Sequence, residues 1–137
     1  MTKKEISLVV ENLTKNAGSS RLDDIISYLG IKVKPLDGKT CYAKYKDKKY
    51  IFIDTNLSEE LKDFAMAHEL GHALLHDCEL DQSFVYRVKN QRIENEANYF
   101  AYKLLGLEID PTYDYTISQY ASQLKVSEDT IKYVVNP

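Results

Sequence analysis

The residues of this sequence best suited to chemistry are three histidines and a glutamate within one short stretch. His68, Glu69 and His72 form the pattern H-E-x-x-H, and His76 follows four residues later. Because residues four apart lie about 40° apart around a helix axis, the imidazoles of His68 and His72 can converge on one ion. Glu69 projects at a neighbouring angle, from which it can reach a water on the metal. The pattern predicts a metal site with two histidine ligands and Glu69 as the catalytic base.

A catalytic zinc site has three protein ligands and one open position, so a third ligand is needed. A metzincin would place a histidine at position 78, where this sequence has Cys78. Another type of site takes a carboxylate from a following helix, which here offers Glu94 and Glu96. His76 lies about 80° from His68 around the helix axis, so we expect it beside the ligands or at the surface.

Small residues favour Glu94 over Glu96 as the third ligand. Ala97 and Ala101 mark where a second helix can come close, and Gly71 is the matching small residue in the H-E-x-x-H segment. Glu94 lies about 40° from the midpoint of the two alanines around the helix axis, whereas Glu96 lies about 120° away. We therefore predict Glu94 as the ligand and interpret Glu96 as a solvated charge on the helix surface.

Asn98 lies one turn after Glu94 on the same helix face. From there its amide can form a hydrogen bond with the imidazole of a ligand and orient it, so we predict Asn98 as an outer partner of the site. Two histidines and a glutamate suit several divalent ions, of which Zn²⁺ is the cofactor that we expect.

Hydrophobic periodicity and capping residues predict the elements that must position these side chains. The predicted helices are 4–16, 21–29, a helix that Ser58 caps and that reaches Leu75, 91–105, 117–124 and 128–135. Runs rich in β-branched and aromatic residues predict strands at 31–34, 41–46 and 49–54, and a hairpin joins the last two. Helices and strands in this order predict an α+β fold.

Size and composition fit one globular domain over residues 1–137. Hydrophobic residues make up 44% of the chain and charged residues 28%, which excludes a disordered or fibrous protein. No apolar run approaches the length that spans a membrane, and the apolar patch near the start is too short for a signal peptide. Two cysteines argue against a disulfide-stapled secreted protein. We therefore expect a cytoplasmic protein without membrane partners.

Residues 116–137 have the apolar spacing of a helix-turn-helix. A DNA-binding segment needs a surplus of basic side chains that neutralise phosphates. Here the charges of Lys125 and Lys132 are balanced by those of Glu128 and Asp129. The net charge of the whole chain is −3. We interpret this segment as a structural helical pair and do not expect direct DNA binding.

Over residues 20–135 the sequence resembles the ImmA/IrrE family of metallopeptidases. The resemblance rests on Ala67–His76, which reads AHELGHALLH, on Glu94–Leu105, which reads ENEANYFAYKLL, and on the strand Tyr50–Asp54. The Met-Pro pair that the family has after its Leu-Leu pair is replaced here by Gly106-Leu107. The resemblance therefore does not imply how the chain leaves this helix.

In that family the histidine pair and a glutamate that opens the later helix hold zinc, and the glutamate inside the motif is the catalytic base. The resemblance thus implies His68, His72 and Glu94 as ligands of Zn²⁺ and Glu69 as the base. We expect a small zincin-like domain, in which a helix bundle surrounds the H-E-x-x-H helix. A short three-stranded antiparallel sheet is expected on one side, together with the C-terminal helical pair.

The resemblance to this family implies a site-specific cytoplasmic protease, of the kind by which prophages and mobile elements inactivate a helix-turn-helix repressor. This implies a zinc-dependent endopeptidase whose protein substrate is a cognate repressor. Two alternatives stay open at this point. The same fold could sequester a repressor without cutting it, as an antirepressor, or the C-terminal helices could make the protein a DNA-binding regulator.

Overall fold

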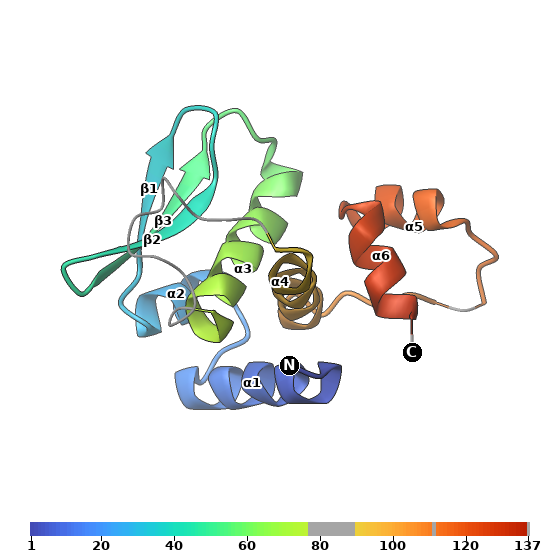
Figure 1. Ribbon diagram of the computed structural model, residues 1–137, viewed down its shortest axis with the longest axis horizontal. Helices are drawn as coiled ribbons and strands as arrows, with labels where there is room; N and C mark the ends of the chain where they lie inside the picture. Colours follow the sequence, from blue (N-terminus) through green and yellow to red (C-terminus); the bar gives the residue numbers. More distant parts are fainter. Residues whose placement is uncertain (77–89, 111, 137) are drawn as a thin grey trace.

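The computed structural model describes residues 1–76, 90–110 and 112–136, and these form an α+β fold. The class expected from the sequence is therefore confirmed. Figure 1 shows α3 with the sheet on one side and α4 on the other. The helices are α1 (Lys3–Ala17), α2 (Leu22–Tyr28), α3 (Glu59–Leu75), α4 (Gln91–Leu104), α5 (Ile117–Leu124) and α6 (Glu128–Val135). The strands are β1 (Lys32–Leu36), β2 (Cys41–Tyr45) and β3 (Lys48–Asp54).

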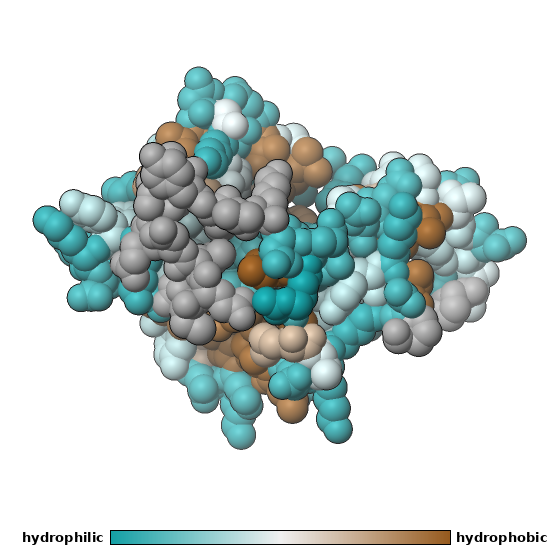
Figure 2. All heavy atoms as spheres, viewed as in Figure 1, coloured by the Kyte–Doolittle hydropathy of each residue, from teal (hydrophilic) through white to brown (hydrophobic). Residues whose placement is uncertain are grey.

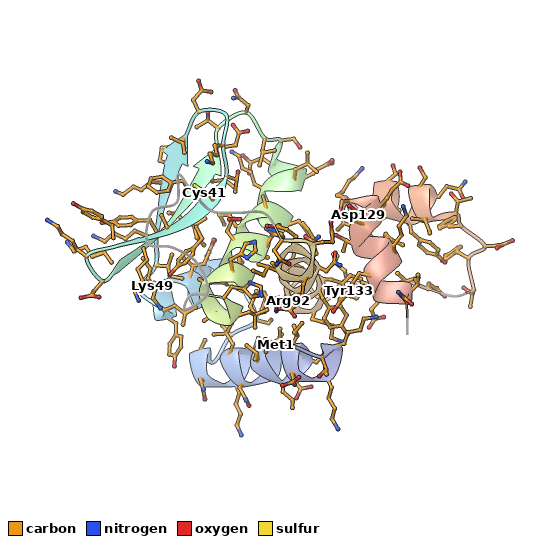
Figure 3. All side chains as sticks on the ribbon, in the orientation of Figure 1. Met1, Cys41, Lys49, Arg92, Asp129 and Tyr133 are labelled. Carbon is orange, nitrogen blue, oxygen red and sulfur yellow. The ribbon has the colours of Figure 1, made fainter. Side chains whose placement is uncertain are left out.

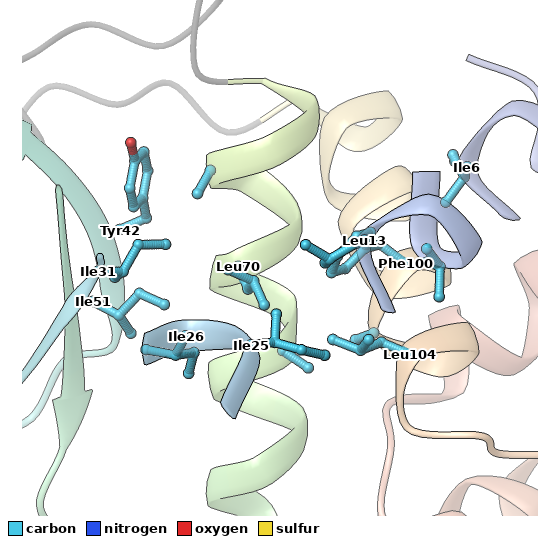
Figure 4. Close-up of a cluster of buried hydrophobic side chains, with 14 residues drawn as sticks. Ile6, Leu13, Ile25, Ile26, Ile31, Tyr42, Ile51, Leu70, Phe100 and Leu104 are labelled. Atoms are coloured by element: carbon cyan, nitrogen blue, oxygen red, sulfur yellow. The ribbon is translucent and has the colours of Figure 1, made fainter. Parts of the chain in front are cut away.

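The hydrophobic core lies on both sides of α3. Figure 4 shows Leu70 of α3 with Ile51 of β3 on one side and Phe100 of α4 on the other. All three side chains are fully buried. Ile6 and Leu13 of α1 extend the same cluster, and α1 packs mainly against α4. Because α3 is held from both sides, the H-E-x-x-H segment is a fixed part of the core.

Helices α3 and α4 come close together at Gly71. A Cβ atom on this glycine would lie 3.1 Å from Cδ1 of Phe100 and 3.2 Å from Cα of Ala97. Only a residue without a side chain fits such a contact without displacement of the neighbouring helix. The small residues of the sequence therefore mark the helix contact correctly. This contact brings the first turn of α4 beside the histidines of α3.

The sheet has the order β1-β3-β2, and it is mixed where we expected it to be antiparallel. The β2–β3 hairpin is antiparallel as predicted, but β1 pairs in parallel with β3. The reason is that the short loop after β1 crosses the end of β3 to reach the far edge. Asp54 stabilises this crossing: its carboxylate accepts from the N–H of Gly38, and its own N–H donates to the hydroxyl of Thr40. Strand β1 is also mostly exposed and contains Pro35, which an edge strand tolerates.

Helices α5 and α6 form the predicted C-terminal pair, with the predicted bounds. The pair contacts the rest of the protein mainly through α6 and α4, where the rings of Tyr133 and Tyr99 meet edge to face. Lys125 ends α5 in a left-handed backbone conformation. Among the described residues, no helix combines the length and apolar character needed to cross a membrane.

Candidate metal centre

Three side chains from two helices bring their ligand atoms together at one point of the structure. His68 and His72 come from α3 and Glu94 from the first turn of α4, and their ligand atoms lie within 4.8 Å of one another. Asn90 caps the start of α4 by accepting hydrogen bonds from the N–H groups of Arg92 and Ile93. The capped helix start and the close contact at Gly71 thus determine where the Glu94 carboxylate lies.

The spacing of these atoms suits a tetrahedral metal site. Nε2 of His68 lies 3.2 Å from Nε2 of His72 and 2.9 Å from Oε2 of Glu94, and Nε2 of His72 lies 3.4 Å from Oε1 of Glu94. Two ligands at about 2.1 Å from a tetrahedral zinc ion are about 3.4 Å apart. Nitrogen and carboxylate donors are also the ones that zinc accepts, so the three residues fit the ion.

The electrostatics of the cluster favour a positive charge at its centre. Burial opposes the charged form of His68, but its contacts with Glu94 and the nearby charge of Glu69 outweigh burial and raise its pKa. Burial lowers the pKa of His72. Burial acts to raise the pKa of Glu94, yet the two imidazoles beside it hold that pKa far below its usual range. The cluster therefore keeps an ionised carboxylate between two imidazoles, as a cation site requires.

Glu69 is buried between the sheet and the cluster of His68, His72 and Glu94. Its Oε1 accepts a hydrogen bond of 2.9 Å from the backbone N–H of Tyr42 in the edge strand β2. Its Oε2 lies 4.0 Å from Nε2 of His68. One carboxylate oxygen of Glu69 is thus held by the backbone of β2, while the other lies on the side of His68.

Asn98 lies where the sequence predicts it. Its Oδ1 is 2.7 Å from Nδ1 of His68, so the N–H at Nδ1 can donate a hydrogen bond to the amide oxygen and leave Nε2 free for a metal. The amide oxygen therefore orients the His68 ring toward the cluster.

The structure corrects the interpretation of Glu96 and narrows that of His76. Glu96 is not a solvated surface charge, because it is only 2% exposed, and His76, at 1%, is not on the surface. Nδ1 of His76 lies 3.0 Å from Nδ1 of His72, and its Nε2 lies 2.8 Å from Oε1 of Glu96. Oε2 of Glu96 accepts from the amino group of Met1, and Arg92 contacts both oxygens. Figure 3 shows Met1 and Arg92 close together, where the start of α1 meets α4.

The sequence did not predict the buried pair of His76 and Glu96, because the burial of this pair depends on Met1, which is distant in the sequence. The signal that was available is the position of His76, one helical turn beyond His72 on nearly the same face. Cys78, which stands where a metzincin has its third histidine, lies outside the described residues.

A cleft of about 760 Å³ opens beside the cluster, with His68 and Asn98 in its wall. Apolar residues of α3, such as Leu61 and Phe64, line one side, and the turn after α5, with Val126, lines the other. In Figure 2 the molecule is indented between the part that carries α3 and the lobe of α5 and α6. His72 is fully buried, whereas the side chains of His68 and Glu94 are partly exposed. Of the three residues in the cluster, His68 is the one that lines this cleft.

Comparison with known proteins adds two findings. The family model described as the IrrE N-terminal-like domain, peptidase M78, matches residues 26–136. The chain is also 33% identical over 123 residues to "Uncharacterized immunity region protein 2" of Bacillus phage phi105, across 84% of this chain and 73% of the phage protein. No solved structure matches the chain.

Proposed function

The chain belongs to the peptidase M78 family of IrrE N-terminal-like domains, and we propose that it is a zinc-dependent endopeptidase. Family membership confirms the resemblance found in the sequence. The observation that carries the proposal is the convergence of His68, His72 and Glu94 beside the buried carboxylate of Glu69.

In this proposal each residue of the cluster has one task. His68, His72 and Glu94 hold the ion, and the chemistry that Zn²⁺ supplies when bound is polarisation of the scissile carbonyl and activation of a water. Glu69 accepts the proton of the attacking water through its Oε2 and then delivers it to the leaving amine. The bond from Tyr42 keeps the Glu69 side chain in place during both transfers.

The substrate that we propose is a helix-turn-helix repressor encoded near the gene of this protein. Support comes from the phage relative, whose name assigns it to an immunity region. The peptide to be cut must reach the cluster at His68, the side chain of which lines the cleft. The cleft beside His68 offers apolar walls for a side chain of that peptide. We do not expect direct DNA binding, because the charges of residues 116–137 are balanced.

The test is the substitution Glu69→Gln, which removes the proton acceptor but leaves the three ligands in place. We expect zinc-loaded wild-type protein to cleave the repressor in vitro, and the variant to bind zinc equally well, as measured by elemental analysis, while cleaving at least about 10³-fold more slowly. Glu59→Gln is the matched control, because Glu59 is an exposed carboxylate on the same helix. It should leave cleavage unchanged.

The same variants separate the peptidase from an antirepressor that only binds. If Glu69→Gln still inactivates the repressor in cells, cutting is not required and the peptidase proposal is wrong. A wild-type protein that binds no zinc would contradict it as well.

A further inference from the structure

Behind the proposed ligand His72 lies a second layer of polar groups that the peptidase mechanism does not use. His76 and Glu96 are buried beside it, and the chain of contacts runs from Nδ1 of His72 to Nδ1 of His76, and from Nε2 of His76 to Oε1 of Glu96. His76 is the cap residue at the end of α3, and its N–H donates to the carbonyl of His72. Both ends of the His76 side chain are therefore held.

The hydrogen bonds that link His72, His76 and Glu96 can run in only one direction when His72 binds a metal. A ligand that uses Nε2 carries its proton on Nδ1, so His72 must donate to Nδ1 of His76. His76 then accepts at Nδ1 and carries its proton on Nε2, from which it donates to the Glu96 carboxylate. Glu96 accepts at both oxygens, since Arg92 also donates to it. Every donor in this sequence thus meets an acceptor.

We propose that His76 and Glu96 are positioning residues that hold His72 in its Nδ1-protonated tautomer and thereby raise the affinity of the site for Zn²⁺. The inference rests on the proposed function only in that the cluster binds a metal. It gives the two histidine ligands different outer partners: a neutral amide for His68 and an imidazole backed by a carboxylate for His72. A carboxylate behind an imidazole increases the basicity of that ligand.

A purely structural role explains this arrangement poorly. Two imidazoles and a carboxylate are costly to bury, and apolar residues of similar size would fill the same space without that cost. Yet all the buried polar side-chain atoms in the described part of the chain have hydrogen-bond partners. Arg92 and the amino group of Met1 also hold the Glu96 carboxylate. These contacts keep Oε1 of Glu96 directed at His76.

The first test measures zinc affinity by competition with a chromophoric chelator. We expect His76→Leu, which removes the acceptor, to weaken zinc binding about 10–100-fold, and Glu96→Gln, which removes the charge, to weaken it less. His76→Gln should restore part of the affinity, since its amide oxygen can accept from His72. Circular dichroism shows which variants fold. If His76→Leu does not fold, His76→Gln and Glu96→Gln still test the proposal.

Thr130→Val is the matched control for loss of a buried polar group. Thr130 is fully buried in α6 and its hydroxyl bonds to Ser127, away from the cluster. The control should lose stability but bind zinc as the wild type does. The proposal is overturned if His76→Leu and Glu96→Gln bind zinc within about threefold of the wild type, or if Thr130→Val weakens binding as much as they do.

The second test reads the tautomers directly. In two-bond ¹H–¹⁵N spectra of the zinc-loaded protein, we expect His72 to carry its proton on Nδ1 and His76 on Nε2. A proton on Nδ1 of His76 would overturn the proposal, because it could then not accept from His72. Neither readout depends on cleavage. Failure of the repressor assay with normal zinc binding would therefore contradict the proposed peptidase while leaving this inference intact.

Discussion

At the scale of single residues, Glu94 is the group that joins the two helices of the cluster, because its two oxygens face the two imidazoles. Glu94→Gln keeps the size of the side chain but removes the anionic ligand. We expect zinc affinity to fall by more than the roughly 10–100-fold that is typical of an outer partner. Isothermal titration with zinc measures this. Glu11→Gln, an exposed carboxylate on α1, is the control and should bind zinc normally.

Asn98 should have a smaller effect, because it acts through His68. Asn98→Ala removes the oxygen that accepts from Nδ1 of His68, and we expect about a tenfold loss of zinc affinity. Asn98→Asp, which keeps an acceptor oxygen at the same place, should bind zinc at least as tightly as the wild type. The same titration measures both variants. Equal affinity of Asn98→Ala and the wild type would contradict the orienting role of this residue.

Much of the cluster could be predicted because its geometry is local. Helical spacing alone puts His68 and His72 on one face, and the small residues of the second helix indicate which side of it faces them. The environment of Glu96 could not be predicted in this way. Its burial depends on His76 at the end of α3 and on the start of the chain, which is 95 residues away in sequence. A helical wheel contains no information about contacts of that range. The metal and catalytic roles of all these residues stay predictions.

At the scale of helices and strands, the contact between α3 and α4 sets the geometry of the site. Gly71→Ala would gain about 1 kcal/mol from helix propensity. The added methyl group, however, would lie 3.2 Å from the backbone of Ala97, which cannot give way as a side-chain end can. Overpacking of this kind costs about 1–3 kcal/mol, so we expect a net loss of about 1 kcal/mol in the free energy of unfolding, measured by urea denaturation.

The same variant should weaken zinc binding, because α4 carries Glu94 and must move away from α3. Phe100→Leu in the Gly71→Ala background makes room on one side of the added methyl group. A double-mutant cycle should therefore show coupling between the two substitutions. Strict additivity, or a Gly71→Ala protein more stable than the wild type, would contradict the close contact.

The β2–β3 turn offers a test on the other side of α3. Lys46 and Asp47 both have positive φ, 48° and 64°, in a two-residue hairpin turn that favours Asn-Gly. Lys46→Asn with Asp47→Gly should therefore stabilise the protein by about 0.5–1 kcal/mol. Thermal unfolding followed by circular dichroism measures the change. A lower midpoint would show that the native side chains of this turn contribute more than its backbone conformation costs.

The strands also show where sequence reasoning reaches its limit. The hairpin was predictable because its two strands adjoin in sequence and its turn is short. The parallel pairing of β1 with β3 was not, since it depends on Asp54 holding the crossing loop at Gly38 and Thr40. Alternation of polar and apolar residues predicts a strand but does not specify its partner.

At the scale of the whole molecule, the candidate site lies where three parts meet. The sheet edge supplies the N–H that holds Glu69, the α3–α4 pair supplies the proposed ligands, and the lobe of α5 and α6 supplies the far wall of the cleft. Nζ of Lys125 in the lobe also lies 3.8 Å from Oε2 of Glu60 in α3. An exposed ion pair of this kind contributes little to stability. The lobe is therefore held mainly by the packing of α6 on α4.

The cleft leads to a last prediction, which rests on the proposed peptidase. Leu61 is 43% exposed in the cleft wall, so Leu61→Ser should change the free energy of unfolding by only about 0.5 kcal/mol. If the cleft holds an apolar side chain of the repressor, the lost contact should slow cleavage about five- to tenfold. Leu8→Ser is the matched control, because Leu8 is 47% exposed on α1 and does not line the cleft. Equal cleavage rates for the two variants, measured as kcat/KM, would exclude the cleft from substrate recognition.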